Sequence, residues 1–346
     1  MMNAPETNYA NHTAERLRVI YPFSDEVLAA VDEVAGRQQR MSCERLLATA
    51  NVLTVRDYQP LEGKPVKVLD IIPPNGEYEA VQVFHLPMAG SMNLDRMVRT
   101  ATLAAAQPTK RLVAVGNAGE IGAKGGKLSI EDAFDVWKGD LAPTVSATMQ
   151  YLEAQGIEEA EHVGGSFGAD KAVEAAVVAS RYDQSTTQLV AMDPASVKHR
   201  SPLEIKQDFA RSEEPLSDYV RATACPAYYE ARHHSGGILR YKVGLFRLSN
   251  LAVAHALTFD GFGSRINQAL AENRQLPATL IWGSASELAD DRIMQPMAAG
   301  LTEQYPERFR AMRVPGQRHA MMNDIYLNAA LVLQGLAEQA NRKQAV

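Results

Sequence analysis

From residue 80 onward, short apolar runs alternate with stretches of helical pattern, and this alternation constrains the fold more than any other feature of the sequence. An apolar run followed by a helix and then by another run is typical of parallel strands joined by crossover helices. The apolar runs are 80–86, 111–115, 162–163, 188–192, 278–282 and 309–314, and the helical stretches are 94–106, 129–155, 168–181, 292–305 and 325–340. We therefore expect an α/β fold with a mostly parallel sheet, helices on both faces and right-handed crossovers.

The residues before this alternation are less regular. We expect roughly the first 20 residues to be disordered or loosely attached, as is common for chain termini. Ser24 predicts the N-cap of a helix that runs to Val34 and ends at Gly36. Two β-like runs follow at 47–55 and 66–72, before a turn rich in proline and glycine.

The alternation stops after residue 194 and resumes near residue 276. Between these positions the pattern is mainly helical and is interrupted by Ser235, Gly236 and Gly237. We therefore predict an N-terminal extension over 1–45, a core formed by 46–194 and 276–346, and a helical insertion over 195–275.

Charge and cysteine content exclude several classes of protein. The net charge is −6, which does not favour nucleic acid or an anionic membrane surface as a partner. Cys43 and Cys225 lie far apart, which is typical of a reducing compartment rather than of a disulfide scaffold. No secretory signal or membrane-spanning run is visible, so we expect a cytoplasmic protein without integral membrane association. The sequence leaves a homo-oligomer open.

The segment 164–168 reads Gly-Gly-Ser-Phe-Gly and lies between a short apolar run and a helical stretch. A serine on a tight turn between a strand and a helix has an exposed hydroxyl, and flanking glycines avoid collisions with the neighbouring backbone. The alanines at 172, 175, 176 and 179 keep one side of the following helix small. Ser166 is therefore the candidate nucleophile.

A serine hydroxyl needs a base that takes its proton and an acid that orients the base. His319 follows the last apolar run and is the candidate base. Glu287 follows the run 278–282 and is the first choice for the acid, because a carboxylate there can accept a hydrogen bond from the imidazole. Asp193 and Asp290 remain as alternative acids.

Other motifs do not predict a cofactor. The glycines at 116, 119 and 122 have the wrong spacing for a dinucleotide-binding loop, and Gly126-Lys127 lacks the remaining residues of a P-loop. The adjacent pair His233-His234 has no spacing suited to a metal, and no H-E-x-x-H motif is present. We expect neither a cofactor nor a metal.

Taken together, these residues resemble the α/β-hydrolase superfamily over roughly 60–340. The matching features, in the order of that family, are His85, 113–119, the turn at Ser166, 189–194, 281–283 and 315–319. The resemblance implies an eight-stranded, mostly parallel sheet and a cap domain at 195–275. It also implies that aromatic and apolar residues of the cap line the substrate pocket, with Tyr228, Tyr229, Leu245, Phe246, Phe259 and Phe262 as candidates.

The family also implies an oxyanion hole formed by two backbone N–H groups. The first is the N–H of Phe167, directly after the nucleophile. The family usually has His-Gly after the third strand, whereas this chain has His85-Leu86-Pro87, and proline has no N–H to donate. Met88 is therefore the expected second donor, with Leu86 as the alternative.

Two further positions depart from the family pattern. Ser286 stands where the family often has an aspartate, and Arg318 stands where a glycine commonly precedes the catalytic histidine.

The expected function is a serine hydrolase that cleaves a carboxylic ester or thioester of a small molecule or lipid through an acyl-enzyme. An acyltransferase with the same three residues is the first alternative, and a non-catalytic binding protein that kept the fold is the second. A dehalogenase of this fold would need aspartate in place of Ser166.

Overall fold

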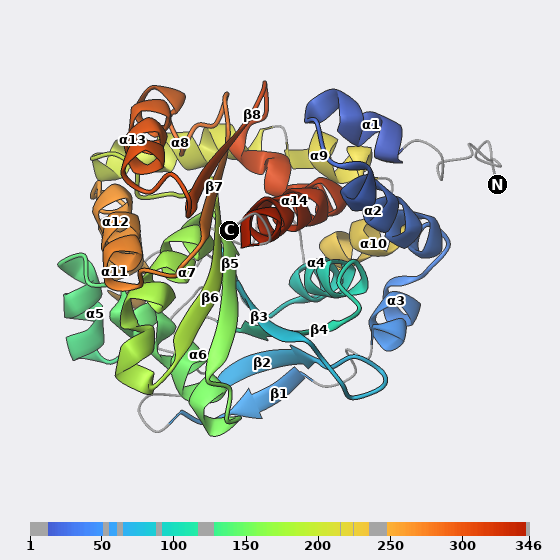
Figure 1. The fold of residues 1–346 in the computed structure, drawn as a ribbon, viewed down its shortest axis with the longest axis horizontal. Helices are drawn as coiled ribbons and strands as arrows, with labels where there is room; N and C mark the ends of the chain where they lie inside the picture. Colours follow the sequence, from blue (N-terminus) through green and yellow to red (C-terminus); the bar gives the residue numbers. More distant parts are fainter. Residues whose placement is uncertain are drawn as a thin grey trace.

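The centre of the protein is an eight-stranded sheet with the strand order β1-β2-β4-β3-β5-β6-β7-β8 (Figure 1). This computed structural model describes residues 13–50, 55–60, 65–87, 92–116, 128–214, 216–223, 225–234 and 248–343. β2 runs antiparallel to β1 and to β4, and every other neighbouring pair is parallel. The strands are β1 Val55–Tyr58, β2 Val66–Ile71, β3 Ala80–His85, β4 Lys110–Val115, β5 Glu159–Gly165, β6 Ser185–Met192, β7 Ala278–Gly283 and β8 Phe309–Val314.

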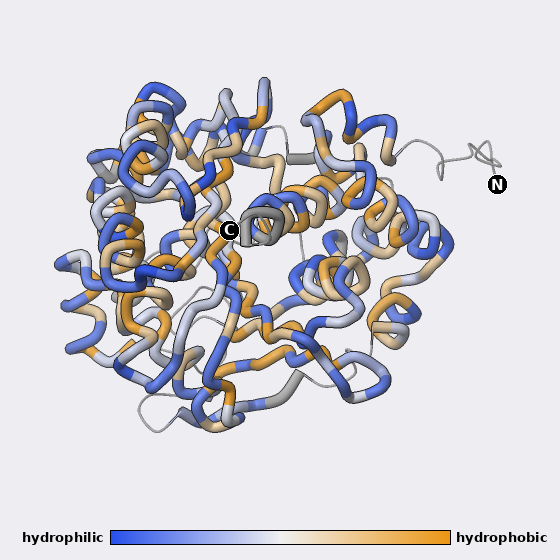
Figure 2. The backbone as a smooth tube through the Cα atoms, in the orientation of Figure 1, coloured by the Kyte–Doolittle hydropathy of each residue, from blue (hydrophilic) through white to orange (hydrophobic). Residues whose placement is uncertain are grey.

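Helices cover both faces of the sheet, and this explains why its strands read as nearly continuous apolar runs. In β6, Val190 and Met192 pack into the cluster on one face, whereas Leu189 and Ala191 pack into the cluster on the other. Figure 2 shows hydrophobic residues along the central strands and hydrophilic residues on the outward sides of many surrounding helices. The main core therefore lies between the sheet and the helices on each side.

The flanking helices form two layers. Helices α4 Leu94–Ala105 and α14 Ile325–Lys343 pack on one face, with residues of both in the larger core cluster. The other face is covered by α6 Ala142–Ala154, α7 Phe167–Val178 and α13 Asp291–Gln304. The expected α/β architecture is confirmed.

The N-terminal helices are part of the core. They are α1 Thr13–Ile20, α2 Asp25–Gln38 and α3 Cys43–Thr49. The expected loose attachment is therefore wrong for residues 13–20, because Leu17 of α1 is buried in the core cluster. α2 packs against α14, and the Ser24 backbone N–H donates to the side chain of Gln334 at 2.9 Å. The hydroxyl of Ser24 also caps α2, as predicted.

Two further predictions near the N-terminus are wrong. α2 continues through Gly36 to Gln38, because this glycine has helical rather than left-handed backbone. The first residues of the predicted strand 47–55 form the end of α3 instead. Ser42 caps this helix, and Leu46 and Leu47 are buried in the core cluster. Tertiary burial thus outweighs the β-like composition of this run.

The predicted helix 129–155 is two helices. α5 Ile130–Trp137 ends just before Gly139, whose φ is +97°, and α6 begins three residues later. A capping box formed by Ser129 and Asp132 starts α5. The left-handed backbone at Gly139 stops the first helix and lets the chain change direction.

The segment after β6 is helical in its described parts. Its helices are α8 Pro202–Glu213, α9 Leu216–Ala222, α10 Pro226–His234, α11 Leu248–Ala256 and α12 Phe262–Glu272. α10 packs on α4, and α11 packs on α5. α12 packs on α7 and shares its buried residues with the sheet cluster, so this helix belongs to the flanking layer. Among the described residues, none of the helices has the length and apolarity needed to cross a bilayer.

Candidate active site

Ser166 lies on the sharp turn between β5 and α7. Its backbone has φ +56° and ψ −133°, a conformation that non-glycine residues rarely adopt. The Ser166 N–H donates to the carbonyl of Met192 at 2.9 Å, which fixes the turn against β6. Only 4% of Ser166 is exposed. The predicted strand–turn–helix context of this serine is therefore present.

The glycines of this motif permit close contacts between backbones. A Cβ on Gly164 would lie 1.9 Å from the carbonyl oxygen of Gly168. A Cβ on Gly168 would lie 2.1 Å from the carbonyl oxygen of His85, at the end of β3. The turn thus needs glycine at both positions, and the start of α7 lies directly against the end of β3.

His319 lies beside the serine. It is the first residue of the 3₁₀ turn η4 (His319–Asn323), which follows β8. Its Nε2 is 3.0 Å from Ser166 Oγ, and its Nδ1 is 2.5 Å from Asp193 Oδ2. The imidazole therefore has the serine on one nitrogen and a carboxylate on the other.

Asp193, rather than Glu287, lies against the imidazole. Asp193 follows β6 directly and is fully buried. Glu287 instead accepts a hydrogen bond from the backbone N–H of His319 at 3.2 Å and pairs with the guanidinium of Arg318. The preference for Glu287 as the carboxylate on the ring is therefore corrected by the geometry, because its oxygens are used by the backbone and by an arginine.

The other alternative acid, Asp290, has a structural position. Its side chain caps α13 by accepting from the Arg292 N–H at 3.1 Å, and it also pairs with Lys198. Hydrogen bonds from Arg292 hold the pKa of Asp290 well below its usual range. The structure shows no contact between this carboxylate and the imidazole of His319.

The carboxylate of Asp193 has two further hydrogen-bond donors. The Gly283 N–H donates to Oδ1 at 3.0 Å, and the Ser286 hydroxyl donates to Oδ2 at 2.6 Å. Ser286 in turn accepts from the N–H groups of Leu288 and Ala289. Buried carboxylates need such partners, and these fix the carboxylate plane toward His319. In the sequence, Ser286 is only a departure from the family pattern, and its contact with Asp193 was not predicted.

The expected oxyanion donors are partly defined. Phe167 is the first residue of α7, so its N–H has no partner within the helix. Met88 lies outside the described residues. Leu86, the alternative, is buried and follows the end of β3, which the Gly168 contact brings to the start of α7.

A buried histidine pair lies beneath this turn and was not predicted. His85 Nε2 and His162 Nδ1 are 2.9 Å apart, on the adjacent strands β3 and β5. Burial lowers the pKa of His162 to about 4 and the pKa of His85 well below its usual value. Both rings are therefore neutral at physiological pH, which lets one donate a hydrogen to the other.

The candidates for the pocket lining do not form one group. Tyr228 is buried and accepts hydrogen bonds from Arg99, whereas Tyr229 is largely exposed. Phe262 is buried in the cluster between the sheet and α7. Phe259 packs edge-on against His255, and Leu245 and Phe246 lie outside the described residues. Their assignment to a substrate pocket stays a prediction.

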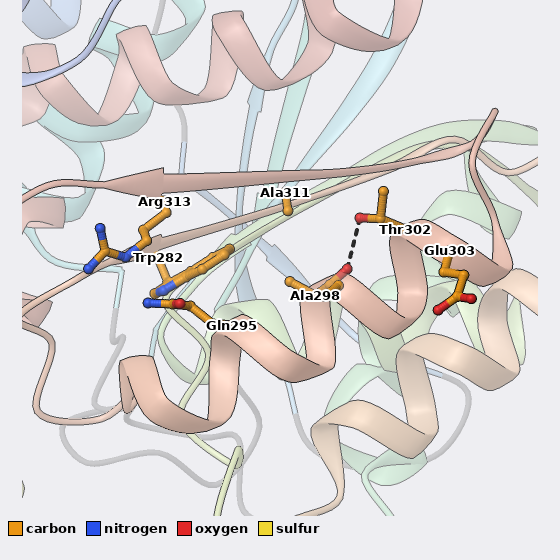
Figure 3. A pocket seen from close by; sticks show the side chains of 8 residues that line it. Trp282, Gln295, Ala298, Thr302, Glu303, Ala311 and Arg313 are labelled. Atoms are coloured by element: carbon orange, nitrogen blue, oxygen red, sulfur yellow. Dashed lines mark hydrogen bonds between the residues drawn. The ribbon is translucent and has the colours of Figure 1, made fainter.

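A hollow of about 530 Å³ lies elsewhere, between α13 and the last two strands (Figure 3). Trp282, Gln295, Glu303 and Arg313 are among its lining residues, and Ser166, His319 and Asp193 are not. In the described part of the chain, no group of three or more histidine, cysteine or acidic side chains is placed to hold a metal ion.

Several solved structures similar to this chain are hydrolases. No protein-family model and no curated protein matches the sequence. A carboxylesterase structure from the thaumarchaeon Nitrososphaera gargenis has a TM-score of 0.51 and 14% identity, covering 83% of this chain and 98% of that one. An ancestral haloalkane dehalogenase has a TM-score of 0.53 and 17% identity, covering 84% and 99%.

The enol-lactonase from Burkholderia xenovorans has a TM-score of 0.52 and 11% identity, covering 79% of this chain and 97% of that one. Such identities carry information about the fold and not about the substrate. The strand order, the turn at Ser166 and these likenesses agree: the chain has the α/β-hydrolase fold.

Proposed function

We propose that this protein is a serine hydrolase that cleaves a carboxylic ester or thioester of a small molecule or lipid. The observation that carries the proposal is the line of contacts from Ser166 Oγ to His319 Nε2, at 3.0 Å, and from His319 Nδ1 to Asp193, at 2.5 Å. This is the arrangement that an activated serine requires: a base within hydrogen-bond distance and an acid that orients the base.

In the first half of the reaction, Ser166 Oγ attacks the acyl carbonyl carbon. Its proton moves to His319 Nε2 as the new C–O bond forms. The carboxylate of Asp193 stabilises the resulting imidazolium through the Nδ1–H bond. Because Gly283 and Ser286 already fix this carboxylate, little reorganisation is needed when the charge develops.

The carbonyl oxygen becomes negative in the tetrahedral intermediate. The Phe167 N–H stabilises it, and the second donor comes from the backbone after β3, with Met88 as first choice. The intermediate collapses as the C–O or C–S bond to the leaving group breaks, and Nε2–H gives its proton to the alcohol or thiol. Water then attacks the acyl-enzyme, with His319 as base, and releases the acid and free Ser166.

Labelling with a fluorophosphonate probe tests this proposal. We expect the purified wild-type protein and the control variant Ser264→Ala, which changes an exposed serine, to be labelled. Ser166→Ala should not be labelled and should lose esterase activity on p-nitrophenyl esters of increasing chain length. The proposal is contradicted if the folded wild type stays unlabelled while a reference serine hydrolase in the same tube reacts, and a binding function then replaces it.

An acyltransferase is the second candidate, because Ser166 and His319 are only 4% and 7% exposed. A site that excludes water favours transfer of the acyl group to an alcohol or thiol over hydrolysis. Adding such acceptors to the p-nitrophenyl ester assay and identifying the acyl products separates the two reactions. Capture of most of the acyl group by the acceptor supports transfer, and release of free acid alone supports hydrolysis.

A further inference from the structure

The backbone that carries His319 is held from two sides. On one side lies the loop after β7, which contains Glu287. On the other side lie α8 and α9, from the helical segment that follows β6. Neither side includes the imidazole partners Ser166 and Asp193, so these contacts act on the position of the base rather than on its ring.

Glu287 binds two successive residues of this backbone segment. Its Oε2 accepts the His319 N–H at 3.2 Å, and its Oε1 pairs with Nε of Arg318. The carboxylate is nearly buried, with 9% of its side chain exposed, so the ion pair is less screened than one at the surface. The same loop places Ser286 against Asp193. One short loop therefore contacts both the acid and the backbone of the base.

Arg318 makes the contacts on the other side, to α8 and α9. Its Nη2 donates to the carbonyl oxygen of Arg211 in α8 at 3.0 Å and lies 3.8 Å from Glu214. Its backbone N–H donates to the hydroxyl of Tyr219 in α9 at 3.2 Å. Tyr219 also donates to the side chain of Gln317, at 3.1 Å. The residue directly before the base thus contacts two helices of the segment.

Thr223, the residue after α9, contacts the chain on the far side of His319. Thr223 Oγ1 donates to Asp324 Oδ1 at 3.3 Å, and Asp324 caps the start of α14 by accepting from Tyr326 and Leu327. The turn that begins at His319 is therefore contacted on one side by α9, at Arg318, and on the other by the residue after α9, at Asp324.

From these contacts we infer that Glu287 and Arg318 are positioning residues that couple α8 and α9 to the catalytic base. Displacement of α8 or α9 moves Arg318. The ion pair between Arg318 and Glu287 transmits this displacement to the backbone of His319. The inference rests on the proposed function. Proton transfer from Ser166 depends steeply on geometry, since a misplacement of about 1 Å can cost on the order of 100-fold in rate.

Three variants test the coupling with a p-nitrophenyl ester as substrate: Glu287→Gln, Arg318→Met and Tyr219→Phe. We expect kcat to fall about 10-fold in the first two and less in Tyr219→Phe, with KM within about two-fold of wild type. Because the Glu287–Arg318 pair is shared, the double variant of these residues should be no slower than the worse single variant. The exposed pair Glu33–Arg37 on α2 supplies matched controls, Glu33→Gln and Arg37→Met, which should retain wild-type kcat.

A purely structural role would lower the unfolding free energy without changing kcat of the folded protein. The inference is overturned if kcat of Glu287→Gln and Arg318→Met stays within two-fold of wild type. It is also overturned if their losses add fully in the double variant.

A second measurement separates this inference from the proposed function. The hydrogen between His319 Nδ1 and Asp193 should give a low-field proton NMR resonance, which needs no turnover. We expect Glu287→Gln and Arg318→Met to shift or broaden this resonance, and the surface controls to leave it unchanged. If the wild type is unreactive but the resonance shifts in the two variants, the hydrolase proposal is contradicted and the positioning role is supported. If the resonance is unchanged in the variants, the positioning role is contradicted.

Discussion

Ser166 and Asp193 share an unusual backbone conformation. Their φ angles are +56° and +48°, in a region that costs non-glycine residues about 1–3 kcal/mol each. Both follow a parallel strand directly, and the N–H of Asp193 is fixed to the carbonyl of Ile281 at 2.7 Å. Such strain persists only where surrounding contacts determine the conformation, and here it turns both side chains toward His319.

At the scale of single residues, we predict that the carboxylate of Asp193 contributes more to the rate of ester hydrolysis than that of Glu287. Asp193→Asn should lower kcat/KM of ester hydrolysis by on the order of 10³–10⁴, because an amide cannot stabilise the imidazolium and favours the wrong imidazole tautomer. Glu287→Gln should lower it only about 10-fold, through the position of the backbone. Steady-state kinetics of both variants give the comparison, and a larger loss in Glu287→Gln than in Asp193→Asn would assign the acid to Glu287 instead.

Among the elements, β3, β5 and α7 meet with almost no space between their backbones. The glycines at 164 and 168 make this possible, and the junction places Gly168, in the first turn of α7, against the end of β3. The proposed oxyanion hole therefore requires α7 to lie this close to β3.

Gly168→Ala should disrupt this junction. Its Cβ would collide with the His85 carbonyl oxygen, so β3 and α7 must separate, and we expect a loss of about 1–3 kcal/mol in unfolding free energy together with loss of fluorophosphonate labelling. Gly36→Ala is the matched control: no atom lies within 4 Å of the added Cβ in α2, and a gain of about 0.5–1 kcal/mol is expected. Urea denaturation measures both; equal stabilities would refute the steric argument.

Across the whole molecule, chain ends and distant strands share one core. α2 lies against α14 although the two are separated by most of the sequence (Figure 1). In the interior, the pair His85–His162 joins the central strands β3 and β5, and burial lowers the pKa of His85 more than the nearby charge of Lys171 in α7 does. Burial of groups that prefer to be charged at low pH makes stability depend on pH.

We expect the unfolding free energy to fall as the pH drops from about 6.5 to 4. The unfolded chain protonates His162 near its usual pKa of 6.5, whereas the folded protein resists protonation down to about 4, so acid favours unfolding. The pKa difference corresponds to about 2 kcal/mol between pH 8 and pH 5. Raised pKa values of the buried Asp170 and Glu174 act in the opposite direction and offset part of it.

The variant His162→Gln isolates this contribution. Urea denaturation gives the unfolding free energy of each protein at pH 8 and at pH 5. The difference between these two values should be smaller in His162→Gln than in the wild type by about 2 kcal/mol. Equal changes in the two proteins would mean that His162 does not carry the effect.

The sequence by itself determined the α/β architecture, most strands, and the setting of Ser166 on a strand–turn–helix. These features follow from local patterns, since apolar runs, glycines and helix caps act over a few residues. It also indicated His319 from its position after the last strand, and the structure places that imidazole 3.0 Å from Ser166 Oγ.

Only the tertiary structure decided which carboxylate reaches the imidazole and what the N-terminal helices do. Asp193, Glu287 and Asp290 all follow strands of one sheet, and local sequence cannot rank them because the distance to His319 depends on strand order and loop path. Likewise, the helix over Cys43–Thr49 depends on burial of Cys43, Leu46 and Leu47 against distant residues. Local patterns specify elements, whereas contacts between remote segments choose among equivalent side chains.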